Sequence, residues 1–192
     1  MKLDIILSGV GGQGILSIAA IIGEAALRKG LHVKQAEVHG MSQRGGSVVT
    51  YVRYGGRVDS PIVDKGQADV ILSFEQLEAA RYLTYLKPDG TLLTNTQQID
   101  PMPVVTGAAV YPQNLIEKMK TAGVKILALD ALTLAKKAGS VKAINVALLG
   151  VLSNYMPFSE DIWREAISAC VPPRFLEVNQ KAFALGRAYR EV

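Results

Sequence analysis

Cysteine and histidine are nearly absent from this chain of 192 residues. Cys170 is the only cysteine, so the chain can form no disulfide within itself and cannot alone supply the thiolate ligands of an iron–sulfur cluster. His32 and His39 are the only histidines, which excludes a histidine-rich metal site. We therefore predict that the chain by itself holds no metal ion.

Long apolar runs are also missing. No run reaches the roughly 18 to 20 residues that a membrane span needs. Glycines in residues 9–14 interrupt the first apolar stretch, and Asn145, Gly150 and Asn154 interrupt the last one. The N-terminus has no small-residue cleavage pattern of a signal peptide. We expect a cytoplasmic protein that does not enter a membrane.

Charge is scarce for a chain of this length. Charged residues make up 20% of the sequence, while hydrophobic residues make up 49%; the usual charged share is about 25%. This composition fits a heavily covered parallel sheet, a large surface buried against another subunit, or both. The formal net charge of +4 permits an anionic ligand but is too small to argue for nucleic acid.

The clearest pattern in the sequence is a short apolar run that stops at a cluster of glycines, in residues 3–14. An apolar, alanine-rich run follows directly, in residues 15–27. This order predicts a strand, a tight turn and a helix. We call residues 9–14 the first glycine-rich loop. Because a helix begins there, its unpaired backbone N–H groups and the positive end of its dipole can hold an anion.

The first glycine-rich loop admits two interpretations. Gly9, Gly11 and Gly14 satisfy the G-x-G-x-x-G pattern of dinucleotide sites, and Glu37, near the end of the next strand, has the place of the ribose-binding acid. Alternatively, the glycines only allow strand and helix to pack closely. Gln13 does not belong to the pattern, and its amide is expected to contact a ligand or a partner.

The order of the expected elements predicts an α/β fold. The first 40 residues predict a β-α-β unit with a parallel strand pair. Further strands are expected at residues 47–54, 57–62, 68–74, 91–95 and 124–129, with a short one within 97–110. Helices are expected at residues 75–86, 112–122, 131–138, 141–155, from 160 to Cys170, and from Pro173 onward, with a turn at 87–90. We predict one domain, sheet-forming over about 1–130 and helical over about 131–192.

A second polar segment, residues 39–46, also follows a strand end; we call it the second glycine-rich loop. It contains His39, Ser42, Gln43 and Arg44 and ends with two glycines. Ligands of open α/β sheets bind outside the carboxyl ends of the strands, where both loops are expected. Arg44 suits a phosphate or a carboxylate, since its guanidinium can bond either in a bidentate way. The alternative is that Arg44 pairs with a surface acid.

Several other polar residues have open roles. Glu75, Asn95 and Asp130 follow strands, where each either serves the site or only caps the next element. Asn145 lies in an apolar helix and needs a partner, either a neighbouring loop or solvent. Cys170, with Ile162 and Ala166, is expected on the buried face of its helix. No nucleophile–base pair, paired carboxylates or metal set stands out, which suits a chain that assists catalysis performed elsewhere.

The two loops together resemble a known family. Residues 9–14 (Gly-Val-Gly-Gly-Gln-Gly) and 37–46 (Glu-Val-His-Gly-Met-Ser-Gln-Arg-Gly-Gly) are similar to those of the gamma-type subunit of 2-oxoacid:ferredoxin oxidoreductases. Within that family the chain is most similar to the small (beta) subunit of indolepyruvate ferredoxin oxidoreductases. The resemblance covers almost the whole chain and implies a Rossmann-like three-layer domain with a mostly parallel sheet.

The resemblance also implies a division of labour. A large partner subunit would carry thiamine diphosphate and the iron–sulfur clusters, oxidatively decarboxylate a 2-oxoacid to an acyl-CoA and pass electrons to ferredoxin. This chain would bind no cofactor alone, would be inactive in isolation and could share the binding of coenzyme A. The family is not known to bind nicotinamide.

On this basis we predict no catalytic residue in the chain and a lip of binding residues that faces the partner's active site or a coenzyme A phosphate. The lip comprises Gly9, Gly11, Gly12, Gln13, Gly14, His39, Ser42, Gln43, Arg44, Gly45 and Gly46. Two alternatives stay open: a purely structural docking subunit, and a stand-alone NAD-dependent oxidoreductase.

Overall fold

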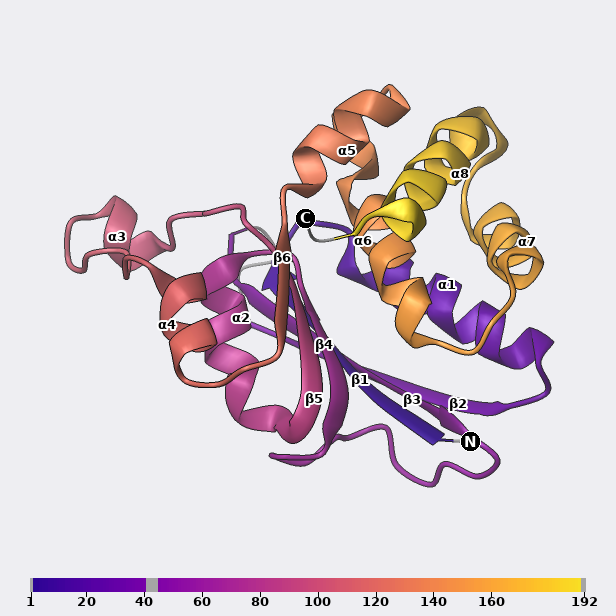
Figure 1. Ribbon diagram of the computed structural model, residues 1–192, viewed down its shortest axis with the longest axis horizontal. Coiled ribbons are helices and arrows are strands. Elements are labelled where there is room, and N and C mark those ends of the chain that lie inside the picture. Colours follow the sequence, from indigo (N-terminus) through magenta and orange to yellow (C-terminus); the bar gives the residue numbers. More distant parts are fainter. Residues whose placement is uncertain (1, 41–44, 191–192) are drawn as a thin grey trace.

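The computed structural model describes residues 2–40 and 45–190, which form an α/β fold (Figure 1). The described strands are β1 (Lys2–Val10), β2 (His32–His39), β3 (Ser47–Gly55), β4 (Ala68–Ser73), β5 (Leu86–Asn95) and β6 (Ile126–Leu129). The described helices are α1 (Ile15–Arg28), α2 (Gln76–Tyr82), α3 (Met102–Val105), α4 (Leu115–Thr121), α5 (Ala131–Ala138), α6 (Ile144–Leu152), α7 (Glu160–Cys170) and α8 (Pro173–Ala188).

One sheet contains the six strands in the order β2-β3-β1-β4-β5-β6. β4, β5 and β6 run parallel to β1, while β3 is antiparallel to both of its neighbours. Leu7 at the centre of β1 pairs with Thr50 of β3 and with Leu72 of β4. The mixed, mostly parallel sheet confirms the predicted α/β fold class.

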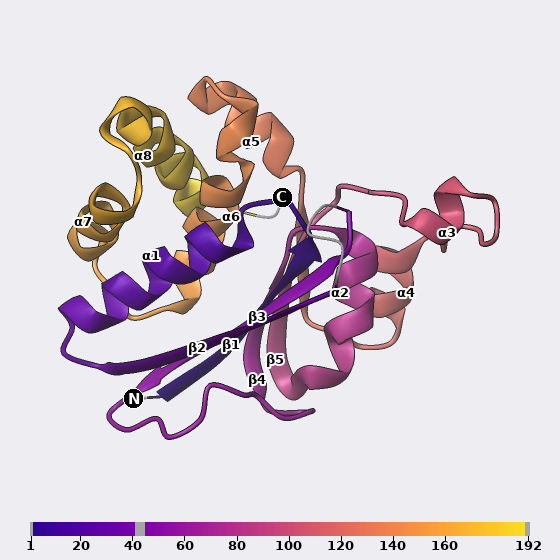
Figure 2. The same cartoon turned by 180° about the vertical axis from the view of Figure 1, so that it is seen from behind.

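The alternation of side chains along β1 creates two cores, one on each face of the sheet. Ile5 and Leu7 point to one face and Ile6 to the other, and all three are fully buried. α1 and the C-terminal helices α6, α7 and α8 lie on the first side, and α2 and α4 cover the second (Figures 1 and 2). The result is a three-layer arrangement.

The C-terminal helices pack around aromatic residues and a close backbone crossing. Trp163 of α7 is completely buried, with its ring centroid 5.5 Å from that of Phe158 and 5.9 Å from that of Phe183. α6 and α8 cross at Gly150 and Gly186, where a Cβ on Gly186 would lie 1.9 Å from the carbonyl oxygen of Ala147. No described helix has the length and apolar character needed to cross a membrane.

The predicted parallel pair of the first 40 residues is wrong. β1 and β2 point in the same direction, but β3 lies between them and pairs with both. The physical reason is the short connection after β2. A strand that follows such a connection returns antiparallel to the one before it, and β3 thereby takes the place next to β1.

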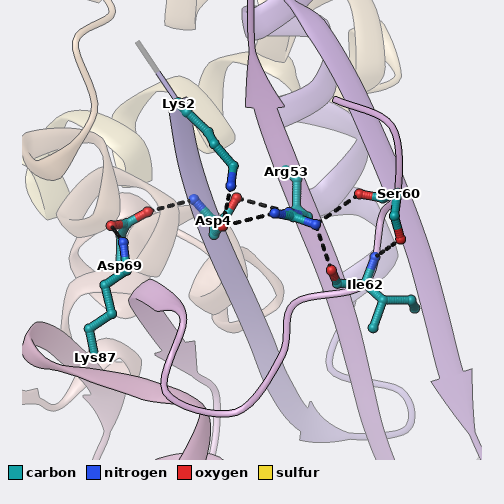
Figure 3. A network of polar contacts seen from close by, with 7 residues as sticks. All are labelled: Lys2, Asp4, Arg53, Ser60, Ile62, Asp69 and Lys87. Atoms are coloured by element: carbon teal, nitrogen blue, oxygen red, sulfur yellow. Dashed lines mark hydrogen bonds and ion pairs between the residues drawn. The ribbon is translucent and has the colours of Figure 1, made fainter. Parts of the chain in front are cut away.

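The expected strand at residues 57–62 does not form. Instead, Arg53 of β3 donates hydrogen bonds to the carbonyl oxygens of Ser60 (3.1 Å) and Ile62 (2.7 Å), which holds this segment as a loop (Figure 3). The same guanidinium donates to both carboxylate oxygens of Asp4, at 2.9 and 3.1 Å. Asp69 and Lys87 extend this network at the amino ends of β1 and β4, the end of the sheet away from the glycine-rich loops (Figure 3).

The segment around Pro88 also differs from expectation. The helix expected over 75–86 ends at Tyr82, a 3₁₀ turn covers Leu83–Tyr85, and the expected turn at residues 87–90 lies within β5. Leu86 pairs with Ala68 of β4, and the next paired residue, Thr91, pairs with Val70. Residues 87–90 therefore form an irregularity in the strand pairing, which accommodates the proline. Residues 97–110 contain α3 rather than a short strand.

The face that α7 buries is rotated from the predicted one. Cys170 is exposed, which contradicts its expected place in the core. The buried residues are Trp163, Ala166 and Ile167, because the large indole occupies the space against α1 and α8. Phe175, in the first turn of α8, is 43% exposed.

Candidate functional site

The two glycine-rich loops lie side by side at the carboxyl end of β1. The backbone N–H of Gly11 donates to the carbonyl oxygen of Gly46 at 2.8 Å, and that of Gly45 donates to the carbonyl oxygen of Gly11 at 3.4 Å. Gly12 (φ +101°) and Gly14 (φ +77°) adopt conformations that favour glycine. The structure thus brings together the described members of the predicted lip. Met41, Ser42, Gln43 and Arg44 lie outside the described residues.

Gln13 braces the first glycine-rich loop from within. Its Oε1 accepts from the backbone N–H of Val10 at 2.7 Å, and its Nε2 donates to the carbonyl oxygen of Phe74 at 3.0 Å and to Oε1 of Gln97 at 3.3 Å. A Cβ on Gly9 would lie 2.6 Å from this Oε1. The amide of Gln13 therefore already has partners within the chain, and Gly9 is needed to make room for it.

Asn145 connects the helical C-terminal part to the same loop. Its Nδ2 lies 3.5 Å from the carbonyl oxygen of Gly14, and a Cβ on Gly14 would approach this nitrogen to 2.5 Å. Of the two expected partners for Asn145, the structure provides the neighbouring loop.

A cavity of about 460 Å³ opens between the loops and the start of α1. It is lined by Val10, Gly11, Gly12, Gln13, Gly14, Ile15, Leu16, Glu37, His39 and Val48. Its volume lies in the range of small-molecule sites, about 300 to 1,000 Å³. Gly14 is the N-cap of α1 and has no side chain that could bond the first-turn amides, so these groups and the helix dipole favour an anion there.

Glu37 and His39 contribute polar groups from β2. Oε2 of Glu37 accepts from the hydroxyl of Thr50 at 3.3 Å, and Nδ1 of His39 lies 3.0 Å from the carbonyl oxygen of Gly40. Because β3 separates β2 from β1, Glu37 lies two strand spacings, about 10 Å, from the strand that leads into the first glycine-rich loop. The arrangement therefore differs from a dinucleotide site, in which the ribose-binding acid follows the strand next to β1.

Glu75, Asn95 and Asp130 act as caps in this structure. Glu75 is buried and accepts from the amides of Leu77 and Glu78 with Oε2, and from the amide of Ile99 and the hydroxyl of Tyr111 with Oε1. Burial, followed by the contact with Glu75, raises the pKa of the Tyr111 phenol.

The other two caps secure the start of α5. Asn95 Oδ1 accepts from the amide of Ala131 at 3.2 Å, and Asp130 Oδ1 accepts from the amides of Leu132 and Thr133. The hydroxyl of Thr133 lowers the pKa of Asp130. Of the two roles considered for these residues, capping is the one that the geometry provides.

One buried acid near the loops is missing from the predicted site. Glu78 of α2 is 4% exposed, and its Oε2 accepts from the hydroxyl of Ser47 at 2.5 Å. Burial raises the pKa of Glu78, while Ser47 and Arg81 oppose that shift. Only the antiparallel placement of β3 brings Ser47 to α2, so no local sequence pattern indicated this contact. Over residues 2–40 and 45–190, no three His, Cys, Asp or Glu side chains gather as a metal site.

Comparison with known proteins identifies the family. The family model described as pyruvate ferredoxin/flavodoxin oxidoreductase matches residues 4–189. The chain is 48% identical to indolepyruvate oxidoreductase subunit IorB of Thermococcus kodakarensis, covering 96% of this chain and 94% of that one. It is 40% identical to the subunit of the same name from Archaeoglobus fulgidus, covering 97% and 94% of the two chains.

Solved structures agree with this assignment. The gamma subunit of a keto/oxoacid ferredoxin oxidoreductase from Geobacter sulfurreducens matches with a TM-score of 0.71 and 26% identity, over 96% of this chain and 95% of that one. A 2-oxoglutarate:ferredoxin oxidoreductase from Magnetococcus marinus shares the fold, with a TM-score of 0.73 and 23% identity; the match covers this whole chain but 32% of that one. From sequence and fold together, the chain belongs to the pyruvate ferredoxin/flavodoxin oxidoreductase family.

Proposed function

We propose that this chain is a subunit of a 2-oxoacid:ferredoxin oxidoreductase complex that acts on an aryl pyruvate. Within the complex it is the subunit that carries neither thiamine diphosphate nor iron–sulfur clusters. The complex oxidatively decarboxylates the 2-oxoacid, releases an acyl-CoA and passes the electrons to ferredoxin. The names of the relatives from Thermococcus kodakarensis and Archaeoglobus fulgidus support indolepyruvate as the substrate class.

The observation that carries the proposal is the pairing of the two glycine-rich loops around the cavity. Their backbone bonds, 2.8 and 3.4 Å long, create a rim of closely approaching backbone at the carboxyl end of β1. Such a rim and the start of α1 suit a phosphate group of coenzyme A. The tip of the second glycine-rich loop, Ser42, Gln43 and Arg44, would add polar contacts and a cation.

The residues of this chain do not fit an iron–sulfur cluster. Cys170 is the only thiolate source, and it lies at the end of α7, on a different element from the loops. We therefore assign the clusters to a large partner subunit, and the family resemblance assigns thiamine diphosphate to the same subunit. In this proposal the chain shapes the entrance to the partner's active site and helps to hold coenzyme A.

The proposal is tested in a complex made by co-expression with the large subunit. We expect the two chains to co-purify and Arg44→Ala to raise the apparent KM for coenzyme A about tenfold, the cost of one charged hydrogen bond. Arg164→Ala is the matched control, because Arg164 forms an exposed ion pair with Glu160 on α7. Unchanged assembly and an unchanged KM in Arg44→Ala would refute the role of Arg44.

A docking-only subunit is the second candidate, favoured by the inward bonds of the Gln13 amide. In that case, variants of the loops would abolish co-purification without altering turnover by the complex that remains. The stand-alone NAD-dependent enzyme is disfavoured by the place of β3 between β1 and β2. A stand-alone NAD-dependent enzyme would be protected from thermal unfolding by NAD and not by coenzyme A. Unfolding temperatures measured with each compound test this alternative.

A further inference from the structure

The beginning of α2 and the segment just before it are bonded to the first glycine-rich loop and to the residue that follows the second. Gln13 of the first loop donates to the carbonyl oxygen of Phe74, two residues before α2 begins. Glu78, in the first turn of α2, accepts from the hydroxyl of Ser47, which directly follows the second loop. α2 lies on the face of the sheet opposite α1 (Figure 2), so it holds both loops from behind the cavity.

The carboxylate of Glu78 is an unusual group to find in this place. It is 4% exposed, and a buried carboxylate is costly unless it is paired and hydrogen-bonded. Its partners are the hydroxyl of Ser47 at 2.5 Å and Nε of Arg81 at 3.4 Å, and the Arg81 side chain is half exposed. The bond to Ser47 is the shorter of the two, and it joins α2 to the first residue of β3.

Ser47 transmits this restraint to the rim. It directly follows Gly45 and Gly46 in the chain. The carbonyl oxygen of Gly46 accepts from the N–H of Gly11, and the N–H of Gly45 donates to the carbonyl oxygen of Gly11. Ser47 itself pairs with Val10 at the end of β1. A shift of Ser47 would therefore move the contact between the loops, because only one residue separates it from Gly45.

We propose that Glu78 is a positioning residue that fixes Gly45 and Gly46, at the end of the second glycine-rich loop, against the first loop through Ser47, and thereby sets the rim that meets coenzyme A. This inference rests on the function proposed above. Glu78 touches no reacting group in this role. It acts through Ser47 and the two glycines that precede it.

The test uses the assembled complex with Glu78→Ala, Ser47→Ala, the double variant, and Glu78→Gln, whose amide oxygen can still accept from Ser47. Glu160→Ala is the matched control, because Glu160 also lies in the first turn of a helix and pairs with an arginine, at 2.7 Å. Two quantities are measured: amide hydrogen exchange of peptides covering residues 9–14 and 45–54, and the kcat and KM for coenzyme A.

We expect Glu78→Ala and Ser47→Ala to speed exchange in both peptides and to raise KM for coenzyme A about two- to tenfold, with kcat unchanged. The effect of the double variant should be smaller than the sum of the single effects, because both substitutions remove the same bond. Full additivity is not the expected outcome, although Glu78→Ala also removes the pair with Arg81 and Ser47→Ala the contact with Tyr82. Glu78→Gln should lie closer to the wild type, and Glu160→Ala should change neither quantity.

Two results would overturn the inference: exchange that is no faster in Glu78→Ala than in Glu160→Ala, or faster exchange with KM unchanged. The function proposed for the rim fails separately. If adding coenzyme A to the wild-type complex does not slow exchange in either peptide, the rim does not meet coenzyme A, whatever Glu78 does to the loops.

Discussion

At the scale of single residues, the polar groups near the rim mostly bond to the chain itself. Gln13, Glu75 and Asn95 each satisfy backbone groups of neighbouring elements. Their carboxyl-end positions were predictable, because strands and glycines are local patterns. Their partners were not predictable, since Gln13 and Phe74 are 61 positions apart and Glu78 and Ser47 are 31 apart. Such contacts follow from strand order, which no short window of sequence contains.

Glu78 predicts a pH dependence of stability. Burial raises its pKa in the folded chain above the usual carboxyl value of about 4.3. The folded chain then binds the proton more tightly than the unfolded chain, so the free energy of unfolding falls as pH rises from about 4.3 through the folded pKa. The free energy of unfolding is measured by urea titration at a series of pH values. The fall with pH should be absent in Glu78→Gln and present in Glu160→Gln. Identical pH profiles for both variants would contradict the expectation.

At the scale of elements, a helix or strand is predicted correctly from the sequence where the residues that define it are close together in the chain. α5 spans Ala131–Ala138 as expected, because Asp130 caps its start and Gly139 ends it in the left-handed conformation. On α7, Ala166 is buried as predicted, whereas Trp163 and Ile167 are buried and Cys170 is exposed, since the face is set by packing against other helices. β3 between β1 and β2 was missed for the same reason: the pairing is non-local.

The crossing of α6 and α8 should not tolerate a side chain. In Gly186→Ala, the new methyl group would overlap the carbonyl oxygen of Ala147 and push the helices apart. We expect a loss of about 1 to 3 kcal/mol in the free energy of unfolding, measured by chemical denaturation. Gly56→Ala is the control, because a Cβ there meets nothing within 4 Å. Equal stability of the two variants would show that the helices separate without cost.

The network around Asp4 should stabilise β1, β3 and the segment at residues 57–62 (Figure 3). Arg53→Met removes the two hydrogen bonds to the buried Asp4 carboxylate, which keeps its ion pair with the half-exposed Lys2 at 3.1 Å. It also removes the donor to Ser60 and Ile62. We expect a loss of about 3 kcal/mol in the free energy of unfolding.

Arg57→Met serves as the control for this network, because its ion pair with Asp59 is almost fully exposed and should contribute less than about 1 kcal/mol. A similar effect of both substitutions in thermal or urea unfolding would show that burial of the Arg53 pair does not matter.

At the scale of the whole molecule, we propose that residues 1–192 fold as one domain. One face of the sheet is covered by α1 together with helices from the last third of the chain, and Leu7, Leu72 and Trp163 belong to the same buried cluster. Family membership follows from the complete match over residues 4–189 rather than from either loop alone.

Removal of residues 131–192 should therefore prevent folding. A chain of residues 1–130 would expose the apolar face that α6, α7 and α8 cover, and should lack a cooperative thermal transition and dispersed amide signals in its NMR spectrum. The full chain measured in the same buffer is the reference. A cooperative transition in the shortened chain would mean that the sheet-forming part is a domain of its own.

The antiparallel place of β3 has one more consequence, for engineering. His39 at the end of β2 pairs directly with Val48 of β3, so the segment between them begins and ends at neighbouring points of the sheet. A different tip can replace residues 40–44 as a cassette, because both strand ends stay anchored by their own ladders and by Gly45 and Gly46. Transplanting this segment from related subunits would thus vary the proposed contacts with coenzyme A while the scaffold stays intact.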